Sequence, residues 1–120
     1  GLSPKAWRES FGVSRAMQAA GWRIIPVNPV VAERGETILG EKAYATLADA
    51  ALHESIDLVN VFRNSEDVPP VMEEAIATGA PAVWLQMGIR HDVAAARARA
   101  AGLNVVQDRC LMVEHRRLAH

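Results

Sequence analysis

The sequence predicts an α/β fold: a doubly wound parallel sheet with helices on both faces, in three layers. Short apolar runs have the composition of strands that are buried on both faces, at 57–62, 81–86 and 103–106. Between and around them, apolar residues recur with helical spacing, at 10–21, 68–79 and 92–101. This alternation, with connections long enough for crossovers, is typical of Rossmann-like sheets.

The first half of the chain supplies a helix and a strand. Val13, Met17 and Ala20 share one face of the helix at 10–21, and Gly21 is placed to end it. The segment 23–28 reads as a short strand, although Pro26 counts against a full ladder, and Pro29 stops it.

The next segments contain turn and capping signals. Residues 30–45 are expected to form a long connection, and Thr46 to Asp49 resembles a capping box that opens a short helix. Ser65 is predicted to cap the helix at 68–79, with Pro69 and Pro70 in or near its first turn. A last helix is expected from about Leu111.

The chain opens at Gly1 as a loop that leaves a strand, and we expect that strand to precede residue 1. Its addition would complete the sheet of one domain over residues 1–120.

Composition narrows the classes of partner. The net charge is −1 and both signs are mixed along the chain, which gives no case for nucleic acid or an anionic membrane surface. A single cysteine fits a reducing, cytoplasmic location, and no apolar run has the length of a transmembrane helix. The four histidines lack metal-ligand spacing, and no catalytic constellation is recognisable.

In such sheets, ligands bind beyond the carboxyl ends of the strands. A loop containing Gly1 and Ser3, followed by a helix, can cradle a phosphate, because glycine admits close approach and helix N–H groups attract anions. The pattern is weak alone: Gly1 and Gly12 do not make a full dinucleotide fingerprint, and the motif by itself favours an ordinary strand–helix turn.

The strand end at Val27, Asn28 and Pro29 has no acidic residue of the kind that holds ribose hydroxyls in NAD-binding domains. Its absence suits a ligand whose ribose carries a phosphate, which Arg34 or Lys42 would meet. In the alternative, Pro29 only ends a strand and the cations are solvated.

Two further strand ends carry candidates. Phe62 and Arg63 could contact an adenine or a phosphate. In the alternative, Phe62 is a core residue and Arg63 lies at the surface. At the strand end that contains Gln86, Gly88 could allow a ligand to approach the backbone closely. A glycine that only forms a turn is the equal alternative. Cys110 follows the last strand; it is either a thiol able to form a mixed disulfide with a ligand or a small buried apolar residue.

Eight segments in order along the chain resemble the single-domain CoA-binding proteins, which are similar to the CoA-binding domain of the succinyl-CoA synthetase alpha subunit. They are Gly1-Leu2-Ser3, Ser10-Phe11-Gly12-Val13, Val27-Asn28-Pro29, Ile38-Leu39-Gly40-Glu41-Lys42, Val61-Phe62-Arg63, Val68-Pro69-Pro70, Trp84-Leu85-Gln86 and Asp108-Arg109-Cys110.

The resemblance implies a Rossmann-like fold and coenzyme A as the ligand. It implies that the Gly1 to Ser3 loop and the helix start at Ser10 to Gly12 face the pyrophosphate. It places the segment 27–29 and Lys42 beside the adenosine and its phosphate, Phe62 and Arg63 beside the nucleotide and the start of the pantetheine arm, and the Gln86 region further along that arm.

The leading hypothesis is non-catalytic binding of CoA or acyl-CoA for carriage, sensing or regulation. The alternative is an NAD(P)-binding redox sensor or oxidoreductase domain. A third possibility is an acyl-CoA enzyme that uses Cys110 or His115. Nothing matches the phosphohistidine domain of the synthetase, so ligase activity does not carry over. The acyl group, protein partner and oligomeric state are left open.

Overall fold

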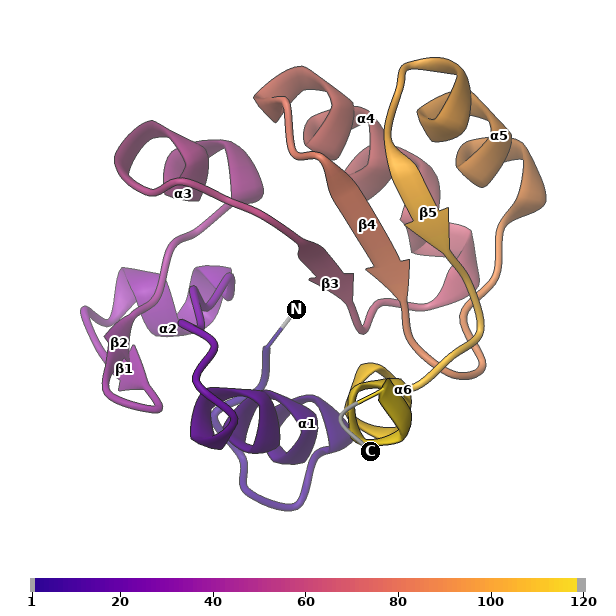
Figure 1. The fold of residues 1–120 in the computed structure, drawn as a ribbon. Coiled ribbons are helices and arrows are strands. Elements are labelled where there is room, and N and C mark those ends of the chain that lie inside the picture. The colour runs from indigo at the N-terminus through magenta and orange to yellow at the C-terminus, as the bar shows by residue number, and fades with distance from the viewer. Residues whose placement is uncertain (1, 119–120) are drawn as a thin grey trace. The chain divides into compact units, whose positions relative to one another are not determined.

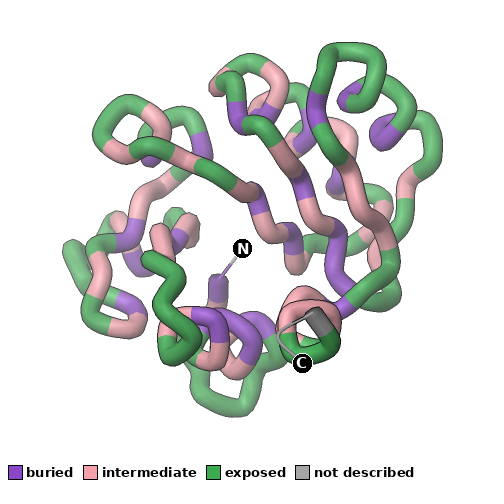
Figure 2. Tube along the Cα trace, in the orientation of Figure 1, coloured by how far each residue is buried: buried purple, intermediate pink, exposed green. Residues whose placement is uncertain are grey.

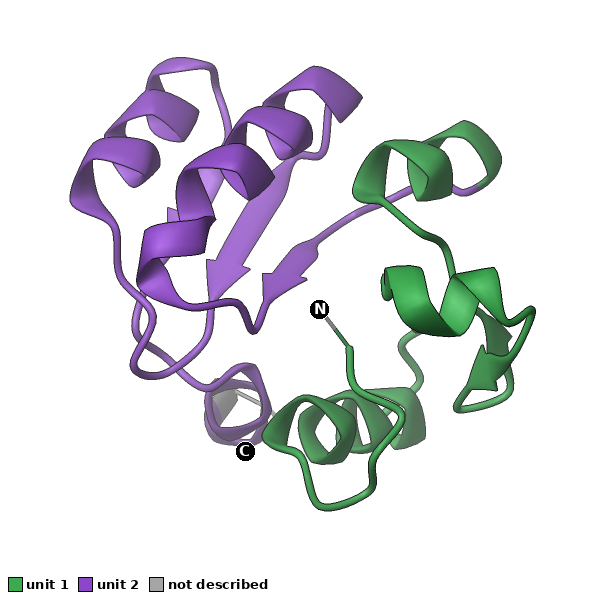
Figure 3. Cartoon of the chain, turned by 180° about the vertical axis from the view of Figure 1, so that it is seen from behind, with its two compact units in different colours: residues 1–53 green, residues 54–120 purple. Residues whose placement is uncertain are grey.

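The computed structural model describes residues 2–118 and divides the chain into two compact units (Figure 1). Unit 1 is Gly1–His53 and unit 2 is Glu54–His120; Figure 3 colours them green and purple. Contacts within each unit define this division, and the single domain over 1–120 stays a prediction.

Unit 1 opens with helix α1, Glu9–Ala19, which buries Val13 and Met17 as the apolar spacing predicts. After the cap residue Ala20, the chain turns away from the helix at Gly21, whose φ of 101° is the left-handed conformation that glycine adopts without strain. The N–H of Trp22 then donates to the carbonyl of Met17 at 3.1 Å, which closes a Schellman-type end.

The strand predicted at 23–28 is wrong as a strand, because this segment forms only an isolated parallel bridge between Val27 and Tyr44. The N–H of Tyr44 donates to the carbonyl of Pro26, and the N–H of Asn28 donates to the carbonyl of Tyr44, each at 2.9 Å. Pro26 has no N–H to extend this ladder, so the pairing stays local.

The connection predicted at 30–45 contains regular structure. Helix α2, Pro29–Glu33, begins at Pro29. The proline that was predicted to stop a strand therefore occupies the first position of a helix, where its missing N–H costs nothing. Strands β1, Thr37–Ile38, and β2, Glu41–Lys42, form an antiparallel hairpin. Its turn residues Leu39 and Gly40 have φ of 55° and 78°, as a two-residue turn of type I′ requires.

Helix α3, Leu47–His53, completes unit 1. The N–H of Asp49 donates to Oγ1 of Thr46 at 3.1 Å, which confirms the predicted cap. The core of the unit joins the start of the chain to α2 and the hairpin, through Leu2, Val31, Ile38 and Ala43.

Unit 2 contains a parallel sheet of three strands in the order β3-β4-β5 (Figure 1). The strands are Val59–Val61, Ala82–Leu85 and Asn104–Val106. Each lies within a predicted strand, and Val83 of β4 is aligned with Val59 on one side and Val105 on the other. Parallel pairing brings the carboxyl ends of all three strands to one edge.

Helices α4, Val68–Thr78, and α5, Asp92–Ala100, lie on the same face of this sheet, as Figure 3 shows from behind. Buried positions follow the strands and the sheet-facing sides of these helices (Figure 2). Ala95 and Ala98 of α5 are fully buried, so small side chains let this helix approach closely. Helix α6, Leu111–Leu118, follows β5.

The predicted cap at Ser65 is wrong. Ser65 lies inside a 3₁₀ turn, Ser65–Asp67, that runs directly into α4, and its Oγ accepts a hydrogen bond from the N–H of Arg90 at 2.9 Å. The hydroxyl therefore ties two loops together, and Pro69 and Pro70 lie in the first turn of α4 as predicted.

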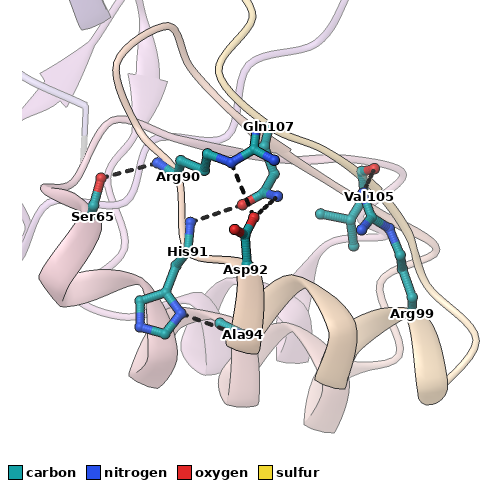
Figure 4. Close-up of polar contacts among 8 residues, drawn as sticks. All are labelled: Ser65, Arg90, His91, Asp92, Ala94, Arg99, Val105 and Gln107. Carbon is teal, nitrogen blue, oxygen red and sulfur yellow. Dashed lines mark hydrogen bonds and ion pairs between the residues drawn. The ribbon is translucent and has the colours of Figure 1, made fainter.

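Strand β5 is one of the two outer strands of this three-stranded sheet, and a side chain covers part of its open edge. Asn104 donates its N–H to the carbonyl of Pro81 beside β4, so the polar backbone groups of Val105 point away from the sheet. The Nη2 of Arg99, from α5, donates to the carbonyl of Val105 at 3.0 Å (Figure 4).

The parallel sheet, its crossover helices and their order confirm the predicted Rossmann-like α/β fold class. Within residues 2–118, none of the helices combines the length and apolar character needed to span a membrane.

Candidate functional site

The loop from Leu2 to Arg8 is anchored at Leu2. The N–H of Leu2 donates to the carbonyl of Val27 at 3.2 Å, and its carbonyl accepts from Nδ2 of Asn28 at 2.9 Å. The Leu2 side chain is 7 % exposed and lies in the core of unit 1. Two consecutive residues at the end of the predicted strand, Val27 and Asn28, thus hold the start of the loop.

The two predicted serines meet in the same loop. The N–H of Ser3 donates to Oγ of Ser10 at 3.0 Å, and the N–H of Lys5 donates to Oγ of Ser3 at 3.2 Å. Unit 1 therefore brings together four predicted site residues, namely Ser3, Ser10, Val27 and Asn28. Gly1 lies outside the described residues.

The N-terminus of α1 adjoins this loop. Arg8 is the cap residue, and its side chain makes no capping hydrogen bond. The N–H groups of Glu9 and Ser10, in the first turn, have no acceptor within the helix and can donate to an anion. Gly12 lies in the next turn, and a Cβ built there would meet no atom within 4 Å, so the space beside it is open.

The side chain of Asn28 makes three hydrogen bonds within the protein. Its Oδ1 accepts from the N–H groups of Val30 at 3.0 Å and Val31 at 3.1 Å, which caps α2. With Nδ2 donating to Leu2, both ends of the amide are occupied. That Asn28 borders the adenosine stays a prediction.

Lys42 and Arg34 are the cations that the sequence offers for a ribose phosphate. Lys42 is exposed on β2, with Nζ 5.3 Å from the centre of the Tyr44 ring, and Tyr44 is bridged to Val27. The ammonium group is therefore carried close to the predicted strand end. Arg34 ends α2 and is exposed, as is Pro29.

In unit 2, Phe62 and Arg63 follow β3. Phe62 is half-buried, and Arg63 is exposed with its Nη2 3.9 Å from Oδ2 of Asp67. An ion pair this long and this exposed holds the guanidinium weakly, so the group can turn to a ligand.

Gln86 follows β4 and is only 1 % exposed. Its Nε2 donates to Oδ1 of Asn60 at 2.5 Å, and its Oε1 accepts from the N–H of Leu111 at 3.3 Å. The amide joins β3, β4 and the start of α6. The resemblance places this region along the pantetheine arm, but the Gln86 side chain itself is occupied within the protein.

Gly88 lies in the loop after β4, which is hydrogen-bonded to the loop after β5. Its φ is 84°, and its N–H donates to Oδ1 of Asp108 at 2.6 Å. Asp108 itself has a φ of 54°, a conformation that Asp and Asn tolerate better than most residues. Sequence reasoning missed this role of Asp108, and nothing in the sequence around it signals the contact.

More hydrogen bonds join the loops that follow the three strands (Figure 4). Gln107 accepts from the N–H of His91 at 2.8 Å and donates to Oδ1 of Asp92 at 3.2 Å. The Nε of Arg90 donates to the same carboxylate oxygen at 3.0 Å. His91 caps α5, because its Nδ1 accepts from the N–H of Ala94 at 3.1 Å. Side chains of these loops therefore hold the carboxyl edge of the β3-β4-β5 sheet in one arrangement.

Cys110 is a free cysteine, 7 % exposed, immediately before α6. The preceding carbonyl, of Arg109, accepts from Nε1 of Trp84 at 2.6 Å. Of the two interpretations of Cys110, this buried position favours the small apolar residue over the reactive thiol. In residues 2–118, no three His, Cys, Asp or Glu side chains gather as a metal site.

Comparison with known proteins gives the family. Residues 1–116 match the model of the CoA binding domain. The uncharacterized protein YneT of Bacillus subtilis strain 168 is 44 % identical over 115 residues, which are 96 % of this chain and 81 % of YneT.

Solved structures agree with this match. A Thermus thermophilus protein is 41 % identical with a TM-score of 0.91, over 98 % of this chain and 85 % of that one. A hypothetical protein from Pyrococcus horikoshii OT3 is 34 % identical with a TM-score of 0.89, over 100 % and 80 % of the two chains. The resemblance found in the sequence is confirmed, and the chain belongs to the CoA-binding domain family, which supports CoA binding in general.

Proposed function

We propose that this chain binds coenzyme A or an acyl-CoA without catalysis of its own, for carriage, sensing or regulation. One observation carries the proposal: in unit 1, Ser3 of the Leu2–Arg8 loop meets Ser10 in the first turn of α1, beside a helix N-terminus whose cap residue, Arg8, makes no side-chain capping bond. These are donors for a phosphate group, and the family to which the chain belongs supplies CoA as the ligand. A cytoplasmic location stays a prediction.

The roles within unit 1 follow from its chemistry. The first-turn N–H groups of α1, together with the Ser10 hydroxyl, are the donors offered to the pyrophosphate. Lys42 is offered to the ribose phosphate, and Asn28 holds the loop. Phe62, Arg63, Gly88 and Cys110, in unit 2, stay predictions as ligand contacts.

Titration of the purified protein is the direct test. A ligand that binds only the folded state adds about 2.7 kcal/mol of stability at a concentration of 100 Kd. We expect CoA and acetyl-CoA to raise the melting temperature and to give calorimetric binding, with no response to NAD(H) or ATP at equal concentration. No binding of CoA at millimolar concentration would contradict the proposal, and NAD(H) binding without CoA binding would favour the redox alternative.

Replacement of Lys42 by alanine tests the ribose phosphate. A single exposed cation beside a phosphate contributes about 1 kcal/mol, so CoA affinity is expected to fall about fivefold. The affinity for 3′-dephospho-CoA, which lacks that phosphate, is expected to stay unchanged. Arg15→Ala, which removes an exposed cation from α1, is the matched control. Equal losses for the two ligands would show that Lys42 acts elsewhere.

A further inference from the structure

One peptide group at the start of the chain is held at both of its polar atoms. The carbonyl of Leu2 accepts from Nδ2 of Asn28 at 2.9 Å, and the N–H of Ser3 donates to Oγ of Ser10 at 3.0 Å. These two atoms belong to the same planar unit, so the two bonds together fix its orientation. Side chains 18 residues apart in the sequence thus hold one peptide plane.

Each of the two side chains is itself fixed. Asn28 caps α2 through Oδ1, which leaves its Nδ2 aimed at Leu2. Ser10 is 7 % exposed and lies in the first turn of α1. Leu2 is further held by Val27, which accepts its N–H at 3.2 Å. The plane therefore links α1 and α2, and the loop leaves it in a set direction.

We propose that Asn28 and Ser10 are positioning residues, which together orient the Leu2–Ser3 peptide so that the loop delivers its donors to the CoA pyrophosphate. The inference rests on the proposed function and goes beyond it, because it gives Asn28 a role through Leu2 instead of a contact with the nucleotide. The Ser10 hydroxyl accepts from Ser3, and its own proton is left as a donor by this bond.

Asn28→Ser separates the two tasks of the asparagine. Serine is a neutral cap residue of similar strength, so α2 keeps its cap, whereas the donor to Leu2 is lost. Asn28→Asp is the second variant: it also caps, it lacks the donor, and it is available if the serine variant does not fold. Ser14→Ala is the control, since it removes a buried hydroxyl from α1 one turn beyond Ser10.

Amide hydrogen exchange tests the inference without ligand. In Asn28→Ser, the N–H of Ser3 is expected to exchange about tenfold faster, although Asn28 bonds to the Leu2 carbonyl and not to this N–H. The N–H groups of Val30 and Val31 are expected to keep their protection. Unchanged exchange at Ser3 would overturn the inference. Ser14→Ala is expected to leave the Ser3 amide unaffected.

Affinity provides the second readout through a double-mutant cycle. Asn28→Ser is expected to weaken CoA binding about tenfold, and Ser10→Ala by more, because the Ser10 hydroxyl is also a donor offered to the pyrophosphate. The double variant is expected to lose little more than Ser10→Ala alone, because both substitutions loosen one peptide. Losses that multiply, or unchanged affinity with a loosened Ser3 amide, would overturn the inference and leave the proposed function standing. If the wild-type chain fails to bind CoA, the proposed function falls and with it the positioning role, whereas the Ser3 exchange still shows whether the peptide is held.

Discussion

Replacing Gln86 by methionine is expected to lower the free energy of unfolding by about 1–3 kcal/mol, because two half-buried polar groups lose their partners. These are Oδ1 of Asn60, in β3, and the N–H of Leu111, at the start of α6. Methionine has a similar length and volume, so the cavity contribution is small. Urea unfolding followed by circular dichroism measures the change.

The control is the partner residue. Asn60→Leu removes the other half of the amide pair, and the double variant is expected to be more stable than the sum of the single losses predicts. The first-turn amides of α6 are expected to exchange faster in Gln86→Met and in the double variant, but not in Asn60→Leu. A loss below about 1 kcal/mol would show that water replaces the amide at little cost and that this buried contact does not hold the sheet edge.

Replacing Asp108 by alanine is expected to lower the free energy of unfolding by roughly 2 kcal/mol, through two separable effects. The carboxylate loses the hydrogen bond from the N–H of Gly88, which measures 2.6 Å. Alanine must also adopt the φ of 54° that Asp108 holds, at a cost of about 1 kcal/mol. Thermal and urea unfolding measure the total.

Two further variants separate these effects. Asp108→Asn keeps an acceptor and tolerates the left-handed backbone, so it is expected to lose less than about 1 kcal/mol. Asp108→Gly relieves the backbone but loses the acceptor, and its stability is expected to fall between those of the other two. If the alanine and asparagine variants were equally stable, neither the bond nor the backbone conformation would matter to the linked loops.

The sequence was most informative where one local signal fixes one local structure. Glycine after the last apolar position placed the end of the first helix at Gly21, which has a positive φ. The apolar runs predicted β3 and β4, because parallel strands are buried on both faces. These features depend on neighbours in the sequence.

The segment from 23 to 45 shows where such signals compete. Its β-branched residues favoured a strand, but the backbone at Pro26 has no N–H to ladder, and only one bridge forms. Asn28 followed by Pro29 is a cap and a first-turn proline, which is a helix start that we interpreted only as the end of a strand. The turn at Leu39 was hidden because leucine rarely adopts positive φ.

The residues of the candidate site were selected by their position at the ends of predicted strands, which predicts only part of what their side chains do. Position after a strand selected Asn28 and Gln86, but it does not reveal whether an amide turns outward or finds a partner inside. Both amides are occupied by the protein. Those partners, Leu2 and Asn60, are 26 residues away in the sequence, and no local pattern indicates such contacts.

The arginine at the outer strand has a consequence for association between chains. The polar groups of Val105 are those through which a foreign strand would extend the sheet, and the guanidinium of Arg99 already occupies its carbonyl. A chain that docked there would have to displace a bonded cation and place its own backbone beside a positive charge. Arg99 thus protects this edge of the sheet against edge-to-edge aggregation.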